Sequence, residues 1–249
     1  LLLNYLVVNY GIIREDIEQF DFHFFTFTQN FKSPFYGFFW ESWSLSIEEW
    51  FYIISPILGY FLLKILNPKK SFLMVTCFII AAPFIYRLSI YDPTIKDFWW
   101  DVIVRKTVLS RLDSIAYGLL IAWFNFYYSA LWRKFRIPAF IGGLLIAVFL
   151  INYRQDVTTF YKQTVYYSLV PFAIMLMIPF FEGIKKATGF IAFIIQHISK
   201  ISYSMYLINL SLVALVIRDN FTPAGGFDGI LKYAIYWIIV ILASTLLYK

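Results

Sequence analysis

Charged residues are scarce in this chain of 249 residues, which holds 21 Lys and Arg and 15 Asp and Glu, or 14% in total. A soluble domain is about one quarter charged, and a chain with so few charges could not cover a surface exposed to water. Hydrophobic residues make up 61% of the sequence. The two values exclude an ordinary soluble protein and predict one that lies in a lipid bilayer.

Cysteine, histidine and glycine are too few or too scattered for several kinds of site. Cys77 is the only cysteine, so an internal disulfide is excluded. His23 and His197 belong to no cluster with metal-ligand spacing, and the glycines form no phosphate-binding loop, so we expect no metal site. The net charge of +6 comes from basic residues in twos and threes between apolar runs, which indicates membrane topology and no nucleic-acid partner.

Long apolar runs are abundant, and each bilayer crossing needs about 20 such residues. The runs do not alternate between polar and apolar residues, as the strands of a membrane barrel would. The segments expected to cross are 47–66, 72–90, 112–128, 138–153, 166–181, 201–217 and 230–248, with 1–13 as the end of a further helix. We therefore predict an all-α polytopic transmembrane helix bundle, seven full helices plus the end of an eighth, in a single domain over residues 1–249.

Charge in the loops predicts which side of the membrane each loop faces. If every segment crosses, three basic groups fall on one side, which would be cytoplasmic: Lys69 and Lys70; Arg133, Lys134 and Arg136; and Lys185, Lys186 and Lys200. The acidic stretch after residue 14 falls on the other side, while the loop 91–110 has mixed charge. Near helix ends, Lys64 and Arg87 are expected to extend their charged groups toward the interface.

The segment 14–43 is rich in aromatic residues and is expected to lie at the membrane interface. Its rings could form an aromatic belt at headgroup depth, or a platform on which sugar rings stack. The sequence alone leaves both interpretations open, and the belt is the simpler one.

The first polar motif runs from Trp43 to Tyr52 and places two carboxylates at the start of a membrane helix. Ser46 and Glu49 have the S-x-x-E spacing of a capping box, which explains Glu49 structurally. Glu48 projects about 100° away on the helix, on the side of Ser44, and is the better candidate for a functional group.

The second motif, Ser110 to Gly118, opens another helix at the same face of the membrane. Ser110 and Asp113 again have capping spacing, which favours a structural role for Asp113. Arg111 lies beside two helix N-termini and could hold an oxyanion or a phosphate, or could pair with Glu48.

The third motif, Ile198 to Asn209, places Ser202, Tyr206 and Asn209 on one face of a helix. Such a polar stripe faces protein or water. It could make hydrogen bonds between helices, or it could line a path for a polar substrate.

Together and in this order, the three motifs resemble the membrane acyltransferase-3 family, which includes O-antigen and exopolysaccharide O-acetylases. The residues from Trp43 to Tyr52 match the family pattern W-S-L-S-x-E-E-x-F-Y, and 111–113 with Gly118 and 201–207 match two weaker patterns. The resemblance implies about ten helices in the family, so that this chain would lack early helices, among them the proposed catalytic histidine, and a short C-terminal segment. Asn209 stands where many members have histidine, which puts proton transfer at this position in doubt.

The resemblance implies an acyltransferase, and more narrowly an O-acetyltransferase, of the bacterial inner membrane. It would move an acyl group, most simply acetyl, from a cytoplasmic thioester such as acetyl-CoA to a hydroxyl of an exported or cell-surface glycan, with no tightly bound cofactor. The catalytic residue expected here is Glu48, and the substrate-binding residues are Trp43, Ser44, Arg111, Asp113, Ser202, Tyr203, Tyr206 and Asn209. Two rival functions remain, a transporter or flippase of an envelope-polymer precursor and a non-catalytic scaffold.

Overall fold

The computed structural model describes residues 2–11, 17–32, 38–184, 188–214 and 226–248. Within these ranges every regular element is helical, and the predicted all-α fold is confirmed. The long helices are α3 (Ser42–Leu63), α4 (Pro68–Ser89), α7 (Asp113–Tyr127), α8 (Ser129–Asn152), α9 (Tyr166–Glu182), α10 (Phe190–Ile208) and α12 (Gly226–Tyr248). The shorter ones are α1 (Leu2–Asn9), η1 (Ile17–Gln19), α2 (His23–Thr26), α5 (Asp97–Trp99), η2 (Trp100–Arg105), α6 (Val108–Arg111), η3 (Tyr161–Val165) and η4 (Asn209–Ala214).

Each of the seven predicted crossings overlaps one of the seven long helices, and α1 lies in the predicted remnant 1–13. Five helical segments have the length and composition to cross a bilayer, namely Pro68–Ser89, Ser129–Asn152, Tyr161–Glu182, Phe190–Ile208 and Asp228–Tyr248. A sixth is formed if Asp97–Arg105 and Val108–Tyr127 count as one span with a bend of 78°. Helix α3 is long enough but does not belong to this set, because Glu48 and Glu49 lower its hydropathy.

Helices α8 and α10 begin well before the apolar runs that predict them. Helix α8 begins at Ser129, so Arg133 and Lys134 lie in its first turns and not in a loop. Helix α10 begins at Phe190, so Lys200 lies inside the helix, and the predicted start at residue 201 is wrong. A helix can begin before the apolar part of its sequence, and a prediction based on hydropathy does not detect those first residues.

The chain forms two compact units. Unit 1 comprises Leu1–Phe24, Tyr36–Ser42 and Lys186–Lys249, and unit 2 comprises Phe25–Phe35 and Trp43–Lys185. Compactness alone does not decide how many domains a chain has, so the single domain stays a prediction.

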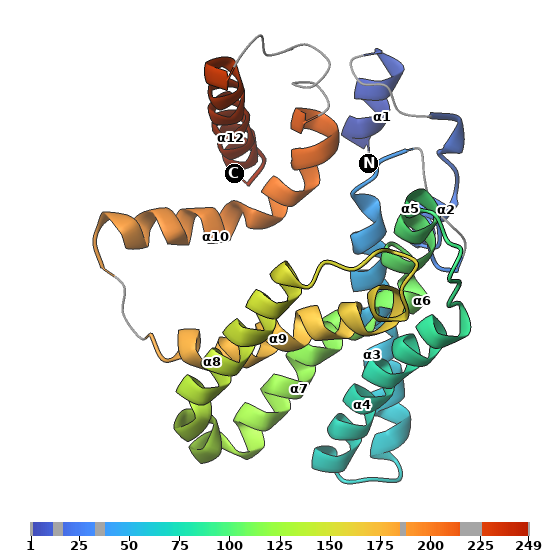
Figure 1. The fold of residues 1–249 in the computed structure, drawn as a ribbon, viewed down its shortest axis with the longest axis vertical. Helices are drawn as coiled ribbons and strands as arrows, with labels where there is room; N and C mark the ends of the chain where they lie inside the picture. The colour runs from blue at the N-terminus through green and yellow to red at the C-terminus, as the bar shows by residue number, and fades with distance from the viewer. Residues whose placement is uncertain (1, 12–16, 33–37, 185–187, 215–225, 249) are drawn as a thin grey trace. The chain divides into compact units, whose positions relative to one another are not determined.

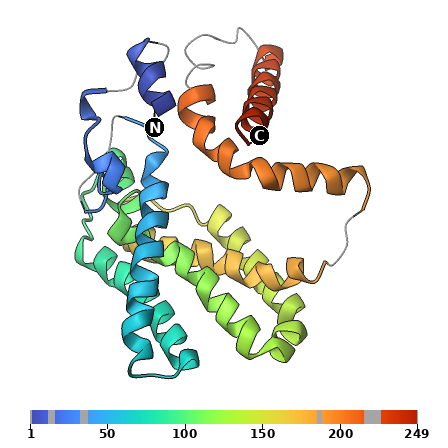
Figure 2. The ribbon, with the colours of Figure 1, turned by 180° about the vertical axis from the view of Figure 1, so that it is seen from behind.

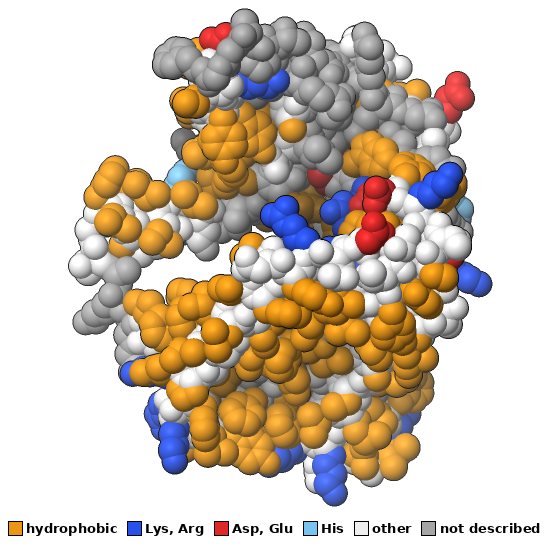
Figure 3. Space-filling model, viewed as in Figure 1, with side chains coloured by type: hydrophobic (Ala, Val, Ile, Leu, Met, Phe, Trp, Pro, Cys, Tyr) orange, Lys and Arg blue, Asp and Glu red, His pale blue; other side chains and the backbone are white. Residues whose placement is uncertain are grey.

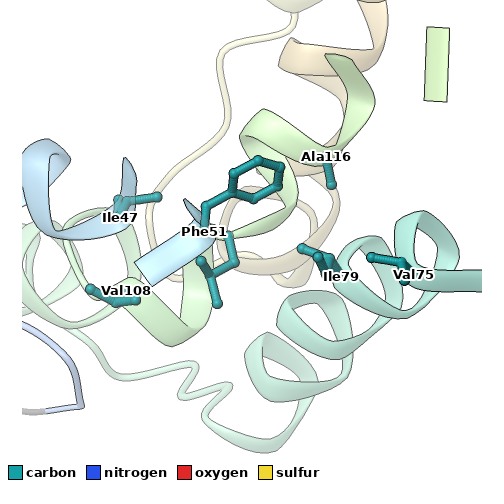
Figure 4. Packing of buried hydrophobic residues seen from close by; sticks show 7 residues of the cluster. Ile47, Phe51, Val75, Ile79, Val108 and Ala116 are labelled. Carbon is teal, nitrogen blue, oxygen red and sulfur yellow. The ribbon is translucent and has the colours of Figure 1, made fainter. Parts of the chain in front are cut away.

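In unit 2, the chain turns back between α3 and α4, which share an apolar core, and α8 packs against α9 (Figures 1 and 2). Helix α7 contacts both α4 and α9. Figure 4 shows the apolar core, where α3 meets α4, α6 and α7 through the buried side chains of Ile47, Phe51, Val75, Ile79, Val108, Leu112 and Ala116. This core fixes the start of α3 beside the junction of α6 and α7.

The two ends of unit 2 differ in charge. The α3–α4 and α7–α8 turns lie at one end (Figure 1), and Figure 3 shows an apolar surface with Lys and Arg side chains at that end. Lys69 is held there, because its Nζ lies 4.3 Å from the centre of the Tyr128 ring and its carbonyl accepts a 2.9 Å hydrogen bond from Trp123. At the other end, Asp101 pairs with Arg105 and Lys106, which explains the mixed charge of the loop 91–110.

In unit 1, α10 packs against α12 around the buried residues Ile208 and Val240. His197 Nε2 and Thr245 Oγ1 lie 3.0 Å apart and join the same two helices. Histidine here acts as a link between helices.

Part of the aromatic segment belongs to the core of unit 1. The Phe24 ring centre lies 5.7 Å from that of Phe20 and 5.4 Å from that of Phe38, and both Phe24 and Phe38 are buried. These two rings form neither a membrane belt nor a sugar platform. Phe22 and Phe25 are 74% and 61% exposed, so the two interpretations stay open for them.

Candidate functional site

A fully buried ion pair joins α4 to α7 at the end of unit 2 away from the basic turns. Arg87 Nη2 lies 2.7 Å from Asp113 Oδ2, and Nη1 lies 3.2 Å from Oδ1. Neither side chain is exposed. Two parallel hydrogen bonds between a guanidinium and a carboxylate form the strongest geometry available to such a pair.

The remaining donors of Arg87 also find partners. Its Nε donates to the Thr164 carbonyl over 3.0 Å, its Nη1 to the Ser110 carbonyl, and its Nη2 to Ser168 Oγ over 2.6 Å. Ser168 then donates to Asp113 Oδ2 over 3.0 Å. The network satisfies both charges within the protein and ties α4, α6, α7, η3 and α9 together.

Two predictions from the sequence are wrong here. Arg87 does not extend toward the interface, because a carboxylate and three other oxygens hold it inside the protein. Asp113 does not cap a helix, since α6 and α7 meet at Leu112 without a side-chain cap. Its carboxylate binds Arg87 instead, and a direct contact between Asp113 and substrate stays a prediction.

Arg111 has a different environment, although it lies only two residues from Asp113. The centre of its guanidinium lies 4.3 Å from the centre of the Tyr167 ring, a cation–π contact. Tyr167 stacks on Trp100 with ring centres 6.0 Å apart. Among the described residues no ion pair joins Arg111 to Glu48 or to Asp113, so pairing with Glu48 is not what holds Arg111.

Four buried polar atoms around Arg111 have no hydrogen-bond partner in the described part of the chain: Arg111 Nε, Ser114 Oγ, Trp100 Nε1 and Tyr167 Oη. Ser114 follows Arg111 by three residues and therefore lies on the same helical face. Buried polar atoms are nearly always satisfied in folded proteins, so a group of unused ones indicates a place for a polar ligand. Arg111 is permanently charged, whereas the serine, tryptophan and tyrosine side chains are neutral. The four side chains together therefore carry a positive charge.

The first and second motifs lie side by side in unit 2. Asn30 Nδ2 donates to the carbonyls of Trp43 and Lys106, over 2.9 and 2.6 Å, and the Asn30 carbonyl accepts from the Val108 backbone over 2.9 Å. Trp50 Nε1 donates to the Phe27 carbonyl over 2.9 Å. The segment before α3 thus connects the start of α3 to the start of α6.

The predicted capping box at Ser46 and Glu49 is wrong. Helix α3 begins at Ser42, so Ser46 is its fifth residue, and it is fully buried. The preceding loop, fixed by Asn30, adds a full turn before the residues that resemble a cap. Glu49 is exposed, while Glu48 and Ser44 are half-buried near the same end of α3.

The third motif lies in unit 1. Ser202 is exposed and donates to the Ser199 carbonyl over 2.8 Å, and Tyr203 is also exposed. Tyr206 donates to the Glu41 carbonyl over 3.0 Å. Asn209 follows α10 and begins η4, and its buried Oδ1 has no hydrogen-bond partner among the described residues.

Sequence reasoning missed Arg87, Thr164 and Ser168 as parts of this site. A charge inside an apolar run was the available signal, because such residues usually pair within the protein. No group of His, Cys, Asp and Glu in the described ranges could hold a metal ion, and His23 lies exposed in α2.

A family model described as an acyltransferase domain matches residues 1–249, the entire chain. No curated protein and no solved structure matches it. The apolar helices and this match together identify an integral-membrane protein with the fold and motifs of the family. The chain therefore belongs to the acyltransferase-3 family and is a membrane acyltransferase.

Proposed function

We propose that the protein transfers an acetyl group from a cytoplasmic thioester donor, acetyl-CoA or a similar acyl-CoA, to a hydroxyl of an exported or cell-surface glycan. The observation that carries the proposal is the group of unused buried polar atoms around the Arg111 cation. In the reaction, the glycan oxygen attacks the thioester carbonyl and loses its proton to a base. The carbon–sulfur bond then breaks, and the thiolate leaves and takes up a proton.

Arg111 is suited to the negative charge that develops during this reaction. Asp113 is already bound by Arg87, so Arg111 keeps its charge for an incoming anion. The anion is either the oxyanion of the tetrahedral intermediate or a carboxylate or phosphate of the substrate. A donor directed at an oxyanion in a site without water typically accelerates the reaction by about 10²–10³-fold.

Glu48 would orient the glycan hydroxyl or the base that deprotonates it. It is half-buried in the second turn of α3, and its neighbour Ile47 belongs to the same apolar core as Leu112, the residue after Arg111. Trp43 and Ser44 would contribute to the acceptor site from the first turn of α3. Asp113 would act through Arg87 as a positioning residue.

The charge of the two ends of unit 2 supports a direction for the reaction. The basic turns would face the cytoplasm by the positive-inside rule, which would place Arg111 near the opposite face, where an exported glycan is available. Ser202, Tyr203, Tyr206 and Asn209 would line the path of the donor from the cytoplasm. The membrane would be the bacterial inner membrane, with no nucleic-acid partner and no resident cofactor.

The test uses the full-length protein in membrane vesicles, with thiol release from acetyl-CoA and acetylation of the glycan by proton NMR as readouts. We expect Arg111→Gln to lower acetylation about 100-fold or more, and Glu48→Gln to lower it strongly. Arg105→Gln is the control, because Arg105 is partly exposed and pairs locally with Asp101.

Normal acetylation by Arg111→Gln would refute the role of the cation, and normal acetylation by Glu48→Gln would remove Glu48 from the site. Movement of a glycan across the vesicle without thiol release would instead favour a transporter or flippase. A stable envelope-polymer partner with neither activity would favour a scaffold.

A further inference from the structure

A groove of about 550 Å³ runs between α8 and α9, in the half of unit 2 that contains the buried ion pair. Most of its length is aliphatic, with Ala147, Leu150, Ile151, Val170, Ile174 and Met177 along its walls. Its mouth is polar, formed by Arg154, Gln155, Lys162 and Tyr166. The groove therefore combines an apolar channel with a cationic end.

The walls of the groove are exposed parts of two candidate membrane spans. Only 6% of the membrane-spanning part of α8 is buried, the smallest share among the candidate spans of the described chain. Ile151 and Ile174, one on each wall, are 65% and 57% exposed. The chains of the surrounding lipids can thus enter the groove from the side.

The two cations at the mouth keep their charge available. Lys162 Nζ lies 3.7 Å from the centre of the Tyr166 ring, and Arg154 Nε makes one long contact, 3.4 Å, to the Ile151 carbonyl. Neither forms an ion pair with any described carboxylate. Asp156 is the only acidic residue between α8 and η3, and its Oδ1 already accepts two hydrogen bonds from Thr158.

We propose that this groove binds an anionic phospholipid, with one acyl chain along the aliphatic walls and the headgroup phosphate between Arg154 and Lys162. A guanidinium and an ammonium are the two side-chain groups that bind phosphate best, and here they stand at the end of a chain-shaped apolar space. A zwitterionic lipid such as phosphatidylcholine would gain the same apolar contacts, but its ammonium group would bring a third positive charge beside Arg154 and Lys162 and offset the attraction of its phosphate. The site therefore selects for headgroup charge.

The binding site is separate from the acyl-transfer site and does not depend on the proposed reaction. Lys162 also lies 5.5 Å from the centre of the Trp100 ring, which stacks on Tyr167 below Arg111. A bound headgroup would hold Lys162 and thereby limit the motion of Trp100. The lipid would support the acyl-transfer site without taking part in its chemistry.

Native mass spectrometry of the full-length protein in detergent tests the proposal. The lipids are phosphatidylglycerol and phosphatidylcholine with identical chains, each added in a titration. We expect one phosphatidylglycerol to bind more tightly than phosphatidylcholine, and the double variant Arg154→Gln/Lys162→Gln to bind it roughly ten- to thirty-fold more weakly. The matched control is Arg133→Gln/Lys134→Gln, which removes two charges from the opposite end of α8 and should keep this lipid.

A second variant, Ala147→Trp, fills the groove and should remove the same lipid while Arg154 and Lys162 remain. Equal affinity for the two lipids, or unchanged binding by the Arg154/Lys162 variant, would overturn the proposal. Displacement of the lipid by millimolar inorganic phosphate would also overturn it, because it would identify a simple anion site in which the apolar channel has no part.

Discussion

The Arg87–Asp113 pair makes a quantitative prediction about stability. In Arg87→Met, the Asp113 carboxylate stays fully buried but loses its counterion. In Asp113→Leu, the Arg87 guanidinium stays fully buried and loses its counterion in turn. Removal of one partner from a buried pair typically lowers stability by about 3–5 kcal/mol, because the other charge is left uncompensated. We expect each single variant to fall in this range.

The double variant should be far less destabilised than the two single variants added together. It leaves no buried charge. Its remaining defects are the Ser110 and Thr164 carbonyls and the Ser168 hydroxyl, which lose the Arg87 guanidinium as donor, and the Ser168 hydroxyl also loses the Asp113 carboxylate as acceptor. Unsatisfied groups of this kind cost about 1–3 kcal/mol each at most, and nearby rearrangement lowers the total. The coupling between the two substitutions should therefore amount to several kcal/mol.

Equilibrium unfolding in mixed detergent micelles, followed by the fluorescence of the 8 tryptophans, measures these values. Arg105→Gln is the control, because its pair with Asp101 is partly exposed and should contribute at most about 1 kcal/mol. If the destabilisation in the double variant equals the sum of the two single values, the two side chains do not act as a pair and the reasoning fails.

Two further predictions concern packing and acid stability. A Cβ at Gly143 would lie 2.6 Å from the Ala173 carbonyl oxygen, whereas one at Gly142 meets only one atom, at 4.0 Å. Gly143→Ala should therefore destabilise the protein by about 1–3 kcal/mol in the same unfolding assay and Gly142→Ala should not; equal effects would contradict close contact of α8 with α9. Hydrogen bonds from the backbone and hydroxyl of Thr158 lower the pKa of Asp156 below its ordinary value of 3.8, so the ionised form contributes stability above that value and loses it as the pH falls through the lowered pKa. Thr158→Val should raise the pKa of Asp156 in a carbon-13 NMR titration, and an unchanged pKa would show that the hydroxyl bond is not significant.

The helices of this protein are largely predictable from its sequence, because a bilayer requires long apolar segments and leaves few other structures possible. The adjacency of the first two motifs was not predictable in detail. It depends on Asn30, whose side chain donates both to the Trp43 carbonyl and to the carbonyl of Lys106, 76 residues further along the chain than Asn30. No local sequence pattern predicts such a contact.

The errors concentrate on polar residues near helix ends. A cap motif is defined by its spacing, and Ser46 has the right spacing inside a helix that had already begun at Ser42. The sequence around Arg87 does not distinguish it from an arginine that extends to the interface, because its partner Asp113 lies on another helix. Spacing along one helix therefore predicted well where polar side chains lie. It predicted poorly which residues of other helices they bind.

The position of the Arg87–Asp113 pair has a consequence for how the protein is assembled during synthesis. Arg87 is made before Asp113, and Ser168 follows only after α8 is complete. Because Arg87 lies in the last turn of α4, its guanidinium can remain in water at the membrane surface while the later helices are still being inserted. The charge can move inward only once its oxygen partners have arrived, so the network of α4, α7 and α9 closes as a late and joint event. A chain that stops before Asp113 should leave Arg87 accessible to water, even though every helix made up to that point is already in the membrane.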